Sequence, residues 1–134
     1  MSDSVYFFQI PGALLASIEH SGDEITLRFS QVNLIAEMEG TFEDTLWTQA
    51  VNLTVKGIEI EGELPACPCE LQGGDMTDNI YTYRDHAPLP INWQGDVRCS
   101  FKAPAAGTGF SISGESMHLE QVGHPRYIKH IKKN

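Results

Sequence analysis

Apolar and polar side chains alternate along most of this chain. Residues 24–30, EITLRFS, and residues 96–102, DVRCSFK, place an apolar side chain at every second position. The segments 13–20, 51–55 and 58–64 do the same. A period of two is typical of a strand with one face on a core and the other in water. The pattern therefore predicts a protein built mainly of strands.

Short glycine-containing segments separate these strands. The segment 21–23, SGD, is expected to turn a hairpin, and the segment 113–115, SGE, is expected to turn another. The alternation changes parity at Gly57, which predicts a turn or a bulge there because glycine tolerates positive φ. The segment 73–75, GGD, also has the composition of a turn. Residues 5–8 are expected to add another strand.

The fold class that follows is all-β. We expect a single domain over residues 1–134, an antiparallel β-sandwich or flattened barrel of roughly eight to ten strands with little helix. Residues 41–50 fit either a short capped helix or a strand rim or loop, and the second interpretation is favoured because both flanks read as strands and Gly40 and Thr41 suit a turn. The basic tail, 124–134, has apolar side chains at the spacing of a docked helical turn.

Charge is unevenly distributed along the chain. The net charge is −9, but residues 1–125 hold all 18 acids and only 5 of the bases, a net −13, while the last nine positions hold the other four bases. An acidic body repels nucleic acid and anionic membranes, so neither is expected as a partner, whereas a partner with a basic surface would be attracted. The basic tail is expected to fray or to fold back onto the acidic body.

The expected location is the cytoplasm of a bacterium. The N-terminus lacks the basic and apolar regions of a secretory signal, and no apolar stretch approaches the length that spans a membrane. The odd count of three cysteines agrees with reduced thiols.

Residues 65–94 interrupt the regular pattern and are expected to form an irregular long connection. This segment holds four of the seven prolines and two of the three cysteines. Long irregular connections often carry function. Flat aromatic rings can stack on sugars while charged and amide groups bond hydroxyls. The alternative is that the rings only cover one end of the sheet. The residues predicted to line a pocket for a small polar ligand or carbohydrate are Asp78, Tyr81, Tyr83, Arg84, His86 and Trp93.

Metal binding and catalysis find less support. Cys67 and Cys69 are closer together than the paired cysteines of a zinc knuckle, and no second pair follows, so no metal or cofactor is expected, although the pair leaves metal binding open. Cys99 is in phase with its apolar neighbours and is expected in the core. Asp85 and His86 are adjacent, and adjacent side chains of an extended chain point apart. No catalytic motif is evident, so an enzyme is not favoured.

These observations support three hypotheses about the function, in order of preference. The leading one is a small cytoplasmic all-β protein-interaction or assembly module, including a homo-oligomer, because extended strands offer edges that can pair. The alternative is a small-ligand or carbohydrate-binding domain with a pocket lined by residues 78–93. A metal-dependent enzyme comes third. Glu59, Glu61 and Glu63 alternate on a predicted solvent face, where they would either contact a basic partner or protect a strand edge.

Overall fold

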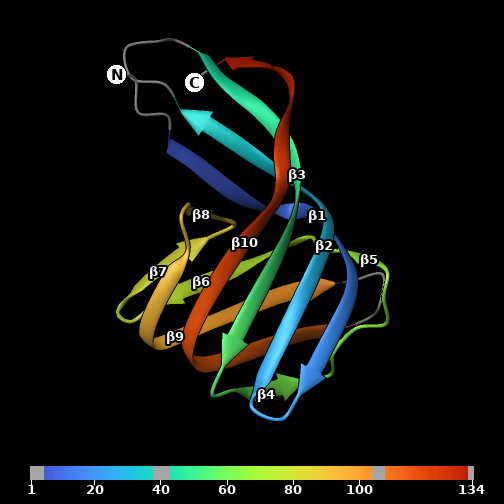
Figure 1. Ribbon diagram of the computed structural model, residues 1–134, viewed down its shortest axis with the longest axis vertical. Helices are drawn as coiled ribbons and strands as arrows, with labels where there is room; N and C mark the ends of the chain where they lie inside the picture. Colours follow the sequence, from blue (N-terminus) through green and yellow to red (C-terminus); the bar gives the residue numbers. More distant parts are fainter. Residues whose placement is uncertain (1–4, 38–42, 104–107, 133–134) are drawn as a thin grey trace.

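The computed structural model describes residues 5–37, 43–103 and 108–132. Within these residues the chain forms ten antiparallel strands and no helix, which confirms the all-β prediction (Figure 1). The strands are β1 (Val5–Ser21), β2 (Glu24–Glu37), β3 (Glu43–Lys56), β4 (Glu59–Gly62), β5 (Cys69–Glu70), β6 (Gly73–Asp78), β7 (Tyr81–Arg84), β8 (His86–Pro88), β9 (Asn92–Ala103) and β10 (Thr108–Lys132).

The strands form one curled sheet. Its path is β5-β1-β2-β3-β10-β9-β6-β7, while β4 pairs with β10 and β8 pairs with β1. The backbone of Asp85 connects the β6 side of the sheet to β1, because its amide donates to the carbonyl of Gly74 at 2.7 Å and its carbonyl accepts from the amide of Ile10 at 2.8 Å. The curl brings the apolar faces of the strands together.

The core occupies the inner face of this curl. Ile25, Leu27 and Phe29 of β2 are at most 2% exposed, as their alternation predicts. Cys99 is also fully buried, which confirms its assignment to the core, and burial raises the pKa of its thiol to about 12. Phe101 and Phe110 meet edge to face with their ring centroids 5.8 Å apart. Aromatic pairs in this arrangement add to the stability that burial provides.

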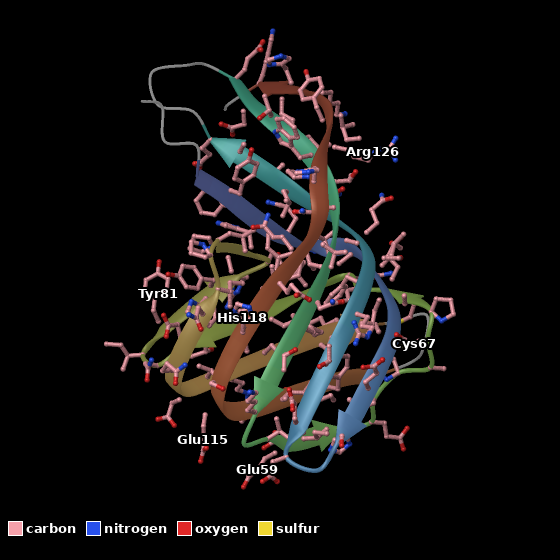
Figure 2. The ribbon with its side chains drawn as sticks, in the orientation of Figure 1. Glu59, Cys67, Tyr81, Glu115, His118 and Arg126 are labelled. Carbon is pink, nitrogen blue, oxygen red and sulfur yellow. The ribbon has the colours of Figure 1, made fainter. Side chains whose placement is uncertain are left out.

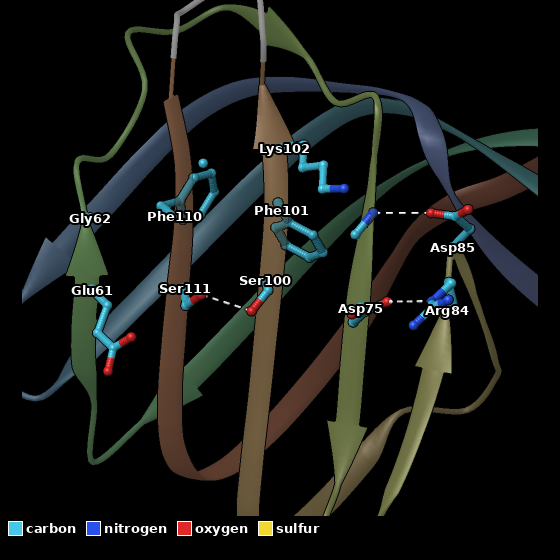
Figure 3. Close-up of a pocket in the computed structure, with 12 residues that line it drawn as sticks. Glu61, Gly62, Asp75, Arg84, Asp85, Ser100, Phe101, Lys102, Phe110 and Ser111 are labelled. Atoms are coloured by element: carbon cyan, nitrogen blue, oxygen red, sulfur yellow. Dashed lines mark hydrogen bonds and ion pairs between the residues drawn. The ribbon is translucent and has the colours of Figure 1, made fainter.

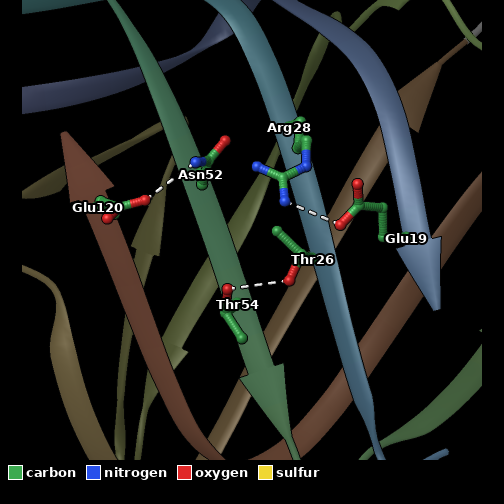
Figure 4. Close-up of polar contacts among 6 residues, drawn as sticks. All are labelled: Glu19, Thr26, Arg28, Asn52, Thr54 and Glu120. Atoms are coloured by element: carbon green, nitrogen blue, oxygen red, sulfur yellow. Dashed lines mark hydrogen bonds and ion pairs between the residues drawn. The ribbon is translucent and has the colours of Figure 1, made fainter. Parts of the chain in front are cut away.

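The outer face of β1, β2, β3 and β10 is polar (Figure 4). The hydrogen bond from Arg28 lowers the pKa of Glu19, which is exposed. Such exposed pairs contribute little to stability. The cross-strand contacts on this face are Arg28–Glu19 at 2.8 Å, Thr26–Thr54 at 3.1 Å and Asn52–Glu120 at 3.0 Å.

Four strands extend beyond the body of the sheet as an arm, at the top of Figure 1. We define the arm as residues 5–9 of β1, 32–37 of β2, 43–49 of β3 and 126–132 of β10. Where the arm leaves the body, the pairing register shifts in β1 between Gln9 and Leu14, in β2 between Phe29 and Val32, and in β10 between Val122 and Arg126. Such bulges bend and twist strands, so their alignment explains why the sheet changes direction here.

The prediction of a hairpin at 113–115 is wrong. β10 continues through this segment, and its register with β9 shifts between Gly114 and Ser116. A bulge puts the strand out of phase by one residue, so that Phe110 and Ile112 before it and Met117 and Leu119 after it are all buried. Gly114 permits the close approach of β3, because a Cβ here would lie 2.5 Å from Val55 Cγ1 and 2.7 Å from the carbonyl oxygen of Lys56.

Some of the other local predictions are confirmed and others are wrong. The hairpin at 21–23 is confirmed, and Gly57 adopts φ 68°, as a turn there requires, although β4 then pairs with β10 and not with β3. Residues 43–50 are strand, as favoured, and residues 41–42 lie outside the described residues. The expected turn at 73–75 is wrong because these residues open β6.

Two segments are more regular than the sequence predicts. The connection 65–94 contains β5, β6, β7 and β8 and the start of β9. The tail does not form the helical turn that its spacing allows, since Arg126–Lys132 pair with β3 as a continuation of β10. Residues 133–134 lie outside the described part of the chain. Apolar side chains in so short a tail fit either period, and the neighbouring strand decides between them.

Candidate functional site

Three of the predicted aromatic residues meet. The rings of Tyr81 and Tyr83 lie 4.5 Å apart, and the ring of Tyr83 stacks on Trp93 at 5.9 Å with an angle of 22°. Trp93 is only 9% exposed and belongs to the core, whereas Tyr81 at the outer end of the cluster is 60% exposed. Asp78 lies opposite Tyr81 in the register of β6 and β7 and accepts a hydrogen bond from Asn79.

The remaining predicted residues lie elsewhere. Arg84 follows Tyr83 in an extended strand and therefore points to the other face of the sheet, where its Nε lies 3.6 Å from Asp75 Oδ1. His86 lies on β8, beside β1, with its ring edge to face against Phe7 at 5.5 Å. The structure thus brings Tyr81, Tyr83 and Trp93 together and separates Arg84 and His86 from them.

A hollow of about 680 Å³ lies on the outer face of the sheet, where β4, β10, β9, β6 and β7 run side by side (Figure 3). One cross-strand row crosses it, and each strand contributes one side chain in register. The hydroxyls of the two serines in this row are 2.7 Å apart. In strand order the row consists of Glu61, Ser111, Ser100, Asp75 and Arg84.

Glycines beside this hollow let its strands approach one another closely. A Cβ at Gly74 would collide with the carbonyl oxygen of Ser100, and one at Gly62 would lie 2.7 Å from the carbonyl oxygen of Gly109. Asp85 borders the hollow and accepts a hydrogen bond from the amide of Gly74 at 3.1 Å. Hydroxyls, carboxylates and cations can bond a polar ligand, so the hollow is a candidate site.

The strongest candidate for a binding surface is an edge of β10. β3 pairs with one edge of this strand as far as Lys132, whereas β9 pairs with the other edge only as far as His118. The amide of Leu119 still donates to Ile91 at 2.9 Å. From Glu120 to Lys132 no described strand pairs with this second edge, so the backbone groups that face it are open to a partner, although Pro125 has no amide to donate.

Apolar and basic side chains line this open edge. Val122, Tyr127 and Ile128 are 45%, 48% and 49% exposed. Between 121 and 132 the chain carries cations and histidines and no acid. The cations are Arg126, Lys129 and Lys132, and all are exposed.

Contacts within the arm hold the end of β10 in place. The ring of Tyr127 lies edge to face on Trp47 at 5.4 Å, and Trp47 meets Tyr6 of β1 at 6.2 Å. His130 Nδ1 lies 3.1 Å from Glu43 Oε2 on the neighbouring strand. The described part of the basic tail is therefore a strand of the arm. Its placement depends on pairing with residues that are distant in the sequence, which the local sequence does not reveal.

The cysteines and acids do not assemble a metal site in the described residues. No group of three metal-ligating side chains is present there. Cys67 and Cys69 are half-buried free thiols, and desolvation raises the pKa of both, which disfavours the thiolate that binds metal or reacts. No helix among the described residues is long and apolar enough to cross a membrane.

Comparison with known proteins identifies no relative of this chain. No protein-family model, curated protein or solved structure matches this chain. Its function is therefore argued from its own geometry.

Proposed function

We propose that this protein is a protein-interaction or assembly module that binds its partner by adding a strand to the open edge of β10, residues 120–132. The observation that carries the proposal is the asymmetry of this strand. β3 covers one edge as far as Lys132, and no described strand covers the other edge beyond Leu119. A partner strand would satisfy the open backbone groups.

The arm prepares this edge for binding. Its pairing with β3 and the contact of Tyr127 with Trp47 fix the backbone of β10 before a partner arrives. Less conformational entropy is then lost on binding than if a flexible tail had to be ordered at the same time. An ordered edge strand is therefore a better template for strand addition than a disordered tail.

Side chains on the edge restrict the partner. Lysines on an edge strand oppose indiscriminate pairing, because each new strand must accommodate their charge. Exposed Val122, Tyr127 and Ile128 still offer apolar contact area. An extended segment that carries acidic and apolar side chains meets both conditions.

Site-specific photo-crosslinking in the cells that produce the protein tests this proposal. A photoreactive phenylalanine replaces Ile128 on the open edge, or Ile80 at the turn between β6 and β7 as a control that is even more exposed. We expect adducts from position 128 and none from position 80. Absence of adducts at 128, or equal adducts at both positions, would show that the edge of β10 is not the docking site.

A polar small molecule in the hollow is the second candidate function. Arg84, which belongs to the segment predicted to line a pocket, lines this hollow. The cross-strand row in the hollow provides hydroxyls beside charges of both signs. Titration with neutral disaccharides, followed by amide NMR shifts, tests it. Shifts centred on Ser100 and Asp75 that disappear in the variant Arg84→Ala would support the site, and no shift at millimolar sugar would exclude it for this class of ligand.

A further inference from the structure

We infer that the strand that docks on β10 is β4 of a second copy of this chain, so that the protein assembles head to tail. This inference rests on the proposed function, because it names the partner of the same open edge. It is carried by the complementary charges of two strands and by their places in the molecule.

The chemistry of β4 matches the open edge of β10. Residues 59–63, EIEGE, contain three acids and no base, whereas residues 126–132, RYIKHIK, contain three cations and no acid. The acidic side chains Glu59, Glu61 and Glu63 are all exposed. β4 pairs with Phe110–Ser113 of β10 and with no other described strand, so one of its edges has no strand partner there.

The two strands lie at opposite ends of the molecule. β4 is at the lower end of the long axis, and the end of β10 is at the upper end (Figure 1). Figure 2 shows Glu59 projecting from the lower end and Arg126 on the upper part of the chain. β4 therefore cannot reach the open edge of its own β10, but one copy can offer β4 to β10 of the next.

The contact is heterologous, since it joins different surfaces of the two copies. Such a contact forms a ring if the rotation closes and a filament if it does not. Pairing of β10 with β10 of another copy would instead oppose Arg126, Lys129 and Lys132 to one another, and like charges across strands are destabilising. Charge thus favours the contact between β10 and β4.

Complementary charge reversal tests this pairing by sedimentation velocity. Wild-type chain is expected to associate as its concentration rises, and added salt is expected to weaken the association. The variants Arg126→Glu/Lys129→Glu and Glu59→Lys/Glu63→Lys each bring like charges together, so each alone should associate at least about tenfold more weakly. A mixture of the two should associate again, because both strands are then mainly acidic in the first variant and mainly basic in the second.

A matched control separates this contact from general charge effects. The variant Glu70→Lys/Asp96→Lys changes exposed acids by the same net amount, and it should associate like wild type. Thermal unfolding confirms that each variant is folded. Wild type that stays monomeric at every concentration, or a mixture that fails to associate, would overturn the inference. In that case adducts from position 128 to a different protein would still support the proposed interaction function. Absence of adducts would contradict both the interaction function and the inferred self-association.

Discussion

The side chain of Gln49 donates from Nε2 to the carbonyl oxygen of Gly123 at 2.9 Å. Gln121 completes the arrangement, because its Nε2 donates to Oε1 of Gln49 at 2.8 Å. Gln49 is 5% exposed and is one of few buried polar residues among those described. It satisfies a backbone carbonyl at the bulge where β10 leaves the body and enters the arm, so it helps to fix the direction of the open edge.

Replacement of Gln49 by alanine should loosen the end of β10. The variant removes two part-buried hydrogen bonds, to the carbonyl of Gly123 and from the side chain of Gln121, and we expect a loss of about 1–1.5 kcal/mol in the free energy of unfolding. Limited proteolysis should also cut faster between 120 and 132. Asn52→Ala is the control, since its hydrogen bond to Glu120 is exposed and its removal should cost less than about 0.5 kcal/mol. Equal effects of the two variants would contradict the role of Gln49.

Gly114→Ala tests the bulge that replaces the expected hairpin. A Cβ at this position would press against Val55 and the carbonyl of Lys56, so urea unfolding should show a loss of about 1–3 kcal/mol. Gly109→Ala is a matched control on the same strand, because its Cβ would lie at an ordinary 3.5 Å from the carbonyl oxygen of Phe101. If Gly114 instead lay in an open turn, both variants would be tolerated alike.

The aromatic cluster on β7 and β9 should behave as packing. Tyr83 is partly buried between Tyr81 and Trp93, so Tyr83→Ala should lower the free energy of unfolding by about 1–2 kcal/mol more than Tyr81→Ala. The emission of Trp93 should shift to longer wavelength in the Tyr83 variant as water reaches the indole. Loss of stability from Tyr81→Ala as large as that from Tyr83→Ala would speak against this arrangement.

Alkaline pH should destabilise the protein through Cys99. Burial raises the pKa of this thiol from 9.0 to about 12, so the unfolded chain releases the proton at lower pH than the folded one. Its contribution is therefore complete below pH 9.0 and is lost as the pH rises toward about 12. Urea unfolding at about pH 8 and about pH 10.5 measures how much the free energy of unfolding falls between these two pH values. This fall should be smaller for Cys99→Val than for wild type. The same loss in both would mean that the thiol is not buried.

The period of alternation predicted the strands well, because burial of one face is a local signal. Ile25, Leu27 and Phe29 show it without interruption. The segment 113–115 misled because a glycine between polar residues suits a bulge as well as a turn, and only pairing with β9 distinguishes them. The strands within 65–94 are short, and neighbours distant in sequence stabilise them.

The candidate sites were harder to predict for the same physical reason. Tyr81, Tyr83 and Trp93 come from one segment and their rings meet, but Arg84 points away from Tyr83 because adjacent side chains of a strand alternate. The hollow combines strands whose residues are distant in sequence, so register alone creates it. The open edge of β10 depends on where β9 ends, which its own sequence does not encode.

Residue-level hydrogen exchange across 120–132 tests the docking edge most directly. In dilute protein, the amides of β10 that donate to β3 should be protected, while the alternate amides on the open edge exchange fast. In concentrated, associated protein the alternate amides should become protected as well, together with amides of β4. Unchanged fast exchange of the open-edge amides in the associated protein would contradict strand addition at β10.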